Sequence, residues 1–323
     1  MGLPGAENAH IPVFRTSQSS NAITRHSTQA AWLRAAIIHG SLLLLSFLTT
    51  TAFGYSLSES FDHGSALAVD RIFDGYVLIA HGDFHVLSGL SFSIPLLLIL
   101  LAHEAGHYIA CQFWRVDASL PYFLPSPLLL GTFGAFIRIR SPIYTRRSLF
   151  DIGASGPFAG FVVLTPFLVA GVAMSRVMHG APAGDSVVFG APLLFRFVEW
   201  LRFGSVPAGA IALHPIAMAA WTGLLATAMN LLPMGQLDGG HILYAAAGER
   251  WHRIVAGSFV LVLVGLGFFY KAWWLWAVVM FLLGRRHPLV YDQTPLRKTR
   301  LTQVAAAFIL LLLSLAVVPV STR

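Results

Sequence analysis

Charged residues are scarce in this chain. They make up 11% of its 323 residues, whereas 56% are hydrophobic and the mean hydropathy is +0.70. An average soluble domain has about 25% charged residues. A soluble fold has too little interior to cover this much apolar surface. The composition therefore excludes an ordinary soluble protein and predicts a membrane protein.

Cysteine is nearly absent, and the basic residues are not gathered into one run of the sequence. Cys111 is the single cysteine, which excludes a disulfide framework and a zinc site built from several cysteines. The net charge is +7, but Lys and Arg lie in short clusters between apolar runs and accompany no nucleic-acid recognition motif. We therefore expect a lipid bilayer around the chain and no nucleic acid among its partners.

Long apolar runs dominate instead. Seven segments reach or approach the ~20 residues with which a helix crosses ~30 Å of hydrocarbon. They cover residues 35–53, 87–110, 152–174, 210–232, 254–270, 272–284 and 302–320. The apolar stretch Leu128–Ile139 is too short and glycine-rich to span, so it predicts a re-entrant hairpin beside a polar cavity. The expected fold class is an all-α polytopic membrane protein of about six or seven transmembrane helices around a three-helix core.

The second segment carries the motif His103-Glu104-Ala105-Gly106-His107. Positions i and i+4 share one face of a helix, so both imidazoles can hold one metal ion. Glu104 can then reach a water on that ion. Five-residue matches of this kind occur by chance in soluble helices. Here, however, three ionisable side chains follow an unbroken apolar run, where they need partners, which favours a metal site.

A third ligand is available near the end of the fourth segment. Asp238 is the single acidic residue between Glu199 and Glu249, and two glycines follow it. Pro233 ends or bends the preceding helix, which would turn this carboxylate toward a cavity. The alternative role of Asp238 is to cap the next helix.

The paired motifs HEAGH and NLLPMGQLDGG resemble the signature of the site-2 proteases, a family of intramembrane zinc metalloproteases. The stretch Gly131–Ile137 is similar to the membrane-embedded hairpin of that family, and the run Arg146–Gly160 is also similar to family sequences. The resemblance covers about residues 87–248.

The resemblance implies a role for each matching residue. The zinc ligands would be His103, His107 and Asp238, and Glu104 would be the general base. Asn230 would help to polarise the scissile carbonyl or hold the substrate backbone. The substrate, a transmembrane segment of another membrane protein, would pair in extended form with the Gly131–Ile137 stretch.

The chain is then expected to divide into four parts. These are a disordered cytoplasmic tail (1–34), a first transmembrane helix with an external loop (35–86), a catalytic membrane core (87–248) and C-terminal transmembrane helices (249–323). If the N-terminus is cytoplasmic and the seven segments alternate, 15 of the 21 Lys and Arg residues fall on the cytoplasmic side. With no clear transit peptide, we expect a bacterial cytoplasmic membrane, with the N-terminus and active site toward the cytoplasm.

Two other functions are compatible with ionisable residues in apolar helices. A zinc transporter or channel would also place His and Asp there, but many transporters are built from repeats and this sequence shows none. A proteolytically inactive scaffold would not need Glu104. The sequence favours hydrolysis and does not indicate the substrate, the regulation of cleavage, the oligomeric state or a role for His241.

Overall fold

The computed structural model describes residues 18–178, 186–283 and 290–322. The chain forms two compact units, Met1–Ser41 and Leu42–Arg323. Of the tail expected over residues 1–34, residues 1–17 lie outside the described part. Residues from Gln18 onward belong to a helix, α1 (Gln18–Asp62), which begins well before the apolar run. Extending an existing helix adds one hydrogen bond per residue with no new nucleation cost, so a polar segment can continue it.

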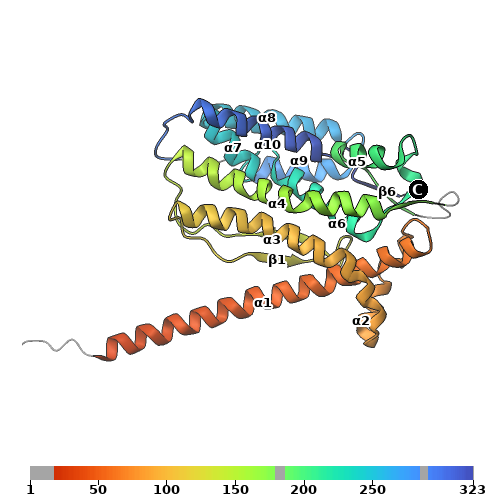
Figure 1. The fold of residues 1–323 in the computed structure, drawn as a ribbon. Coiled ribbons are helices and arrows are strands. Elements are labelled where there is room, and N and C mark those ends of the chain that lie inside the picture. The colour runs from red at the N-terminus through yellow and green to blue at the C-terminus, as the bar shows by residue number, and fades with distance from the viewer. Residues whose placement is uncertain (1–17, 179–185, 284–289, 323) are drawn as a thin grey trace, which may run out of the picture. The chain divides into compact units, whose positions relative to one another are not determined.

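The larger unit is mostly helical (Figure 1). After α1 it contains α2 (Asp74–His81), α3 (Leu90–Phe113), α4 (Arg146–Met174), α5 (Leu193–Phe203), α6 (Pro215–Asn230), α7 (Asp238–Ala247), α8 (Glu249–Leu266), α9 (Ala272–Leu283) and α10 (Lys298–Ser314), with the 3-10 turns η1 (Val69–Arg71), η2 (Phe84–Gly89) and η3 (Ala208–Ala210). Each predicted apolar segment overlaps one of the helices α1, α3, α4, α6, α8, α9 and α10, although the bounds differ.

Among the described residues, three helical stretches are long and apolar enough to cross a membrane. They are Leu33–Asp62, Phe84–Phe113 and Arg146–Met174. The helical membrane fold agrees with the sequence, whereas six or seven spans remain a prediction. A span needs ~20 residues, and α6, with 16 residues, and α9, with 12, fall short of that length.

The structure forms a β-hairpin in the region of the predicted re-entrant element. Strands β1 (Tyr122–Pro125) and β2 (Thr132–Phe136) pair antiparallel. The turn between them needs positive φ at Leu130 and Gly131, and the backbone of Thr49 and Thr50 on α1 packs where a Gly131 side chain would lie. The hairpin itself is thus observed, and its depth in a bilayer remains a prediction. Two further strand pairs join β3 (Arg176–Val177) to β5 (Ile211–Ala212) and β4 (Val187–Phe189) to β6 (Val320–Thr322).

The core that positions the site is formed by α3, α4 and α6, which run side by side and contact one another pairwise (Figure 1). Large apolar side chains such as Leu96, Leu164 and Trp221 are fully buried between them. Gly171 lets α4 approach the backbone of α6 so closely that a Cβ there would lie 2.3 Å from the Ala217 nitrogen. Close backbone contact of this kind is typical of helix packing within membranes.

Candidate metal centre

The HExxH motif lies in the second half of α3 and faces the protein interior. His103, Glu104 and His107 are 5%, 4% and 7% exposed. The two imidazole rings meet edge to face with centroids 4.9 Å apart, as expected for positions i and i+4 on one helix face. The helix therefore presents two adjacent nitrogen ligands and one carboxylate to the same buried space.

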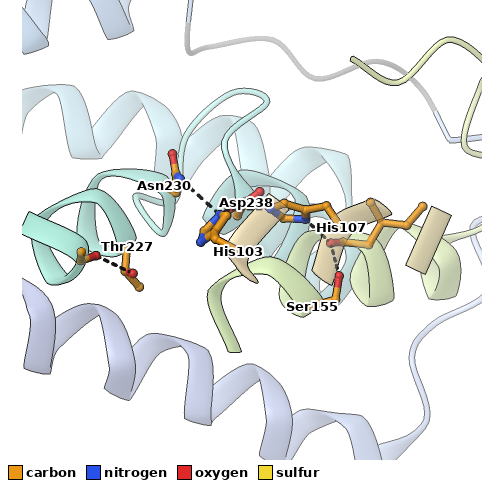
Figure 2. A network of polar contacts seen from close by, with 8 residues as sticks. His103, His107, Ser155, Thr227, Asn230 and Asp238 are labelled. Atoms are coloured by element: carbon orange, nitrogen blue, oxygen red, sulfur yellow. Dashed lines mark hydrogen bonds and ion pairs between the residues drawn. The ribbon is translucent and has the colours of Figure 1, made fainter. Parts of the chain in front are cut away.

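Asp238, the first residue of α7, completes this group. Its Oδ2 lies 3.2 Å from His103 Nε2 and 3.3 Å from His107 Nε2 (Figure 2). One ligand atom from each of the three residues falls within 4.8 Å of the others, so they could hold a metal ion. Asp238 is far from the HExxH motif in the sequence. It reaches the motif because Pro233 and the glycines that follow turn α7 back onto α4, with Gly239 against the Leu231 carbonyl.

The donor chemistry fits a divalent metal. His107 Nδ1 donates a hydrogen bond to the Ile152 carbonyl at 2.7 Å, so in the neutral ring Nε2 carries a lone pair. That lone pair faces a carboxylate oxygen of Asp238, and two acceptors at this distance need a proton or a cation between them. Two imidazole nitrogens and one carboxylate are a ligand set of catalytic zinc sites.

Helix α4 supplies no ligand but shapes the centre. A Cβ at Gly156 would lie 2.1 Å from His107 Nε2, and one at Gly160 would lie 3.2 Å from the Cβ of His103. The Ile152 carbonyl also accepts a hydrogen bond from Ser155 Oγ at 2.9 Å (Figure 2). The sequence signal for this role is the set of small residues at 153, 156 and 160 within the run Arg146–Gly160.

Asn230, the last residue of α6, also reaches the centre. Its Nδ2 lies 3.3 Å from His103 Nε2 (Figure 2). The structure thus brings together all five predicted site residues, which line one cavity of about 200 Å³: His103, Glu104, His107, Asn230 and Asp238. His241 lines this cavity as well but does not belong to the group that could hold a metal.

A second cavity of about 240 Å³ meets the first at the site. His103, Glu104 and Asn230 line both cavities. The remaining lining of the second is mainly apolar and comes from α3, the β2 strand, α6 and Trp276 of α9. The first also receives polar groups from Gln236 and His241. Glu104 therefore lies between a more polar space and a more apolar one.

Comparison with known proteins gives a family and several relatives. Residues 91–271 match the model of peptidase family M50. The chain is 31% identical over 237 residues to "Probable zinc metalloprotease EGY1, chloroplastic" of Arabidopsis thaliana, covering 71% of this chain and 43% of the relative. It is 36% identical over 167 residues to the Oryza sativa subsp. japonica protein of the same name, covering 50% and 29%. It is 29% identical over 199 residues to "Probable zinc metalloprotease EGY2, chloroplastic" of Arabidopsis thaliana, covering 61% and 36%.

The chain spans less than half the length of these relatives. Their names correct the expected localisation. They are chloroplastic plant proteins, which points to an organellar membrane, so the prediction of a bacterial cytoplasmic membrane was wrong. The charge asymmetry of the loops reports how a chain is oriented in its membrane and does not distinguish one host membrane from another.

The relatives named as zinc metalloproteases, together with the clustered His103, His107 and Asp238, support zinc as the metal of this site. The family match runs over more than half of the chain and contains both motifs that supply the candidate metal ligands. The resemblance to site-2 proteases is therefore confirmed, and the chain belongs to peptidase family M50.

Proposed function

We propose that this chain is a zinc metalloprotease that hydrolyses peptide bonds in or near transmembrane segments of membrane proteins. The observation that carries the proposal is the placement of Glu104. This carboxylate is buried beside the His103, His107 and Asp238 group, on a helical stretch long enough to cross a membrane.

The chemistry follows from the residues around the cavity. A zinc ion held by His103, His107 and Asp238 would lower the pKa of a bound water and polarise a peptide carbonyl. Glu104 accepts the proton of the attacking water and returns it to the leaving amine. Asn230, whose amide lies 3.3 Å from His103 Nε2, would donate a hydrogen bond to the carbonyl oxygen as negative charge develops on it.

The apolar cavity suits a transmembrane substrate. It is lined by Ile99, Leu100, Phe133 and Trp276, and by Gly134 and Ala135 of the β2 strand. A substrate helix must unwind before attack, because its carbonyls are already hydrogen bonded. Addition of the unwound segment to the edge of β2 would replace some of those hydrogen bonds.

Transport of zinc is not supported. The family match is to a peptidase, and within the described residues one group of side chains could hold a metal, whereas a conduction path needs sites that an ion can leave in succession.

The test is cleavage of a model transmembrane substrate by purified protein in detergent, with zinc content measured on the same samples. Wild type should bind zinc and cleave, Glu104→Gln should bind zinc and lose cleavage by at least ~10²-fold, and Asp238→Asn should lose both. Absence of zinc from the wild type, or equal cleavage by wild type and Glu104→Gln, would refute the proposal.

A further inference from the structure

A buried arginine that the proposed chemistry does not use lies at the start of α4. Arg146 is 8% exposed, and a buried charge is stable only when its donors are satisfied. Within the described part of the chain no carboxylate lies within ion-pair distance of it. Its partners are main-chain carbonyls: Nε donates to Ala245 at 2.8 Å, Nη2 to Ala246 at 2.9 Å and Nη1 to Gln293 at 3.3 Å.

Two of these carbonyls belong to the last turn of α7, which ends at Ala247. The last carbonyls of a helix have no partner within the helix, and the negative end of the helix dipole favours a cation there. Gly248 follows with φ of 84°, so the chain turns away directly after this contact. The guanidinium therefore caps α7 at its C-terminus.

The other end of α7 is the metal site, because Asp238 is its first residue. A helix of 10 residues is about 15 Å long and behaves as a rigid rod on that scale. A contact that fixes the C-terminus of α7 along its axis therefore also fixes the position of the Asp238 carboxylate.

The same α4 helix holds the two histidines. Ile152 accepts the Nδ1 hydrogen of His107, and Gly156 and Gly160 give the two imidazole rings their space. At Gly153 a Cβ would meet the His241 Cβ at 2.8 Å and the Asp238 carbonyl at 3.3 Å, so α7 also lies directly on α4. All three metal-binding residues are thus positioned against one helix that contributes no ligand.

We propose that Arg146 is a positioning residue that fixes α7, and with it Asp238, in register with His103 and His107. The inference rests on the proposed function, because it takes these three residues as the zinc ligands. The guanidinium is suited to this role because its planar fork carries donors on three nitrogens and can bind several carbonyls at once. All the donors of a lysine ammonium lie on a single nitrogen.

The test compares Arg146→Gln with Arg146→Lys and with Arg147→Gln. Arg147 is the neighbouring residue on α4, exposed over the Trp114 ring, so its substitution removes the same charge without touching α7. Zinc affinity is measured by competition with a chelator, well below the unfolding temperature of each variant. The visible spectrum of the cobalt(II)-substituted protein reports the ligand geometry independently of activity.

Arg146→Gln should weaken zinc binding by about 10- to 100-fold, the effect typical of groups that orient metal ligands, and alter the cobalt spectrum. Arg146→Lys should fall between this variant and wild type, and Arg147→Gln should match wild type. If Arg146→Gln does not fold, Arg146→Lys decides alone, and a wild-type zinc affinity and cobalt spectrum in it would overturn the inference. Wild-type zinc binding in Arg146→Gln would also overturn it while leaving the proposed protease intact. Failure of the wild type itself to bind zinc would instead refute the proposed function.

Discussion

The imidazole of His107 and the main-chain carbonyl of Ile152 are joined by a hydrogen bond of 2.7 Å across two helices. This bond fixes the tautomer of the histidine, because Nδ1 must carry the hydrogen and Nε2 the lone pair. A main-chain carbonyl cannot be removed by a side-chain substitution, so the orientation of this ligand depends on how closely α3 and α4 pack.

Gly156 allows this close packing. A Cβ at this position would lie 2.1 Å from His107 Nε2 and 2.4 Å from Cε1, so Gly156→Ala must displace the imidazole ring. We expect zinc affinity to fall at least about tenfold, as for other changes that misorient a ligand. The control is Gly257→Ala on α8, where no heavy atom lies within 4 Å of the added Cβ. Chelator competition measures both variants, and equal zinc affinity would contradict the close packing of α4 against His107.

Asn230 should act on the reaction and not on the metal. Its side chain approaches His103 but offers an amide donor, which can stabilise charge on the carbonyl oxygen of a substrate. Asn230→Ala should lower kcat by about 10²-fold, the cost of losing such a donor, and keep its zinc. Steady-state kinetics on the model substrate distinguish the roles, since a rise in KM with unchanged kcat would show that Asn230 only binds substrate.

The turn of the β1–β2 hairpin is held by α1 and α2. Thr49 Oγ1 lies 2.6 Å from the Gly131 carbonyl, and the Tyr76 hydroxyl donates to the Ser126 carbonyl at 3.2 Å. Losing one such hydrogen bond costs about 1 kcal/mol of free energy, which corresponds to a factor of roughly five in an equilibrium constant. Thr49→Val and Tyr76→Phe should each reduce kcat/KM on a transmembrane substrate by several-fold without loss of zinc.

The matched control for these two variants is Ser41→Ala, whose hydroxyl bonds within its own helix to the Ile38 carbonyl. It should behave as wild type. If all three variants cleave equally, the hairpin does not need its tether to α1 and α2, and the proposed pairing of substrate with β2 loses its support.

Glu199 should make stability depend on pH. It is 6% exposed on α5, and burial raises its pKa from 4.5 to about 7, with Arg196 opposing the shift. The pKa of Glu199 is higher in the folded state than in the unfolded state. The free energy of unfolding is therefore highest below pH 4.5, falls as the pH rises and levels off above about 7. The loss is on the order of 3 kcal/mol.

Glu199→Gln stays neutral and should remove this decline in unfolding measurements between pH 5 and 8. Glu249→Gln, which changes the same kind of group in a half-exposed ion pair with Arg253, should keep the wild-type slope. A wild-type slope in Glu199→Gln would show that another group controls the pH dependence.

The candidate metal site could be predicted from the sequence because the residues that would bind the ion are side chains in motifs with defined spacing. His103 and His107 follow the helical period, and Asp238 stands in an acid-poor stretch between Pro233 and α8. The contacts that position these ligands could not be read in the same way. The Ile152 contact uses a main-chain carbonyl, a group that every residue type has. Arg146 binds carbonyls 99 and 100 residues away. Neither contact therefore produces a local sequence pattern.

The two cavities that meet at Glu104 have a consequence for where the products of the proposed hydrolysis would lie. Hydrolysis turns one uncharged amide into a carboxylate and an ammonium, and neither charged end is stable against the apolar walls at Leu100 and Phe133. The space lined by Gln236 and His241 offers those ends polar partners. An uncut segment therefore suits the more apolar cavity and the cut ends suit the more polar one, so the two sides of Glu104 would accommodate the substrate and the products of the proposed hydrolysis in different surroundings.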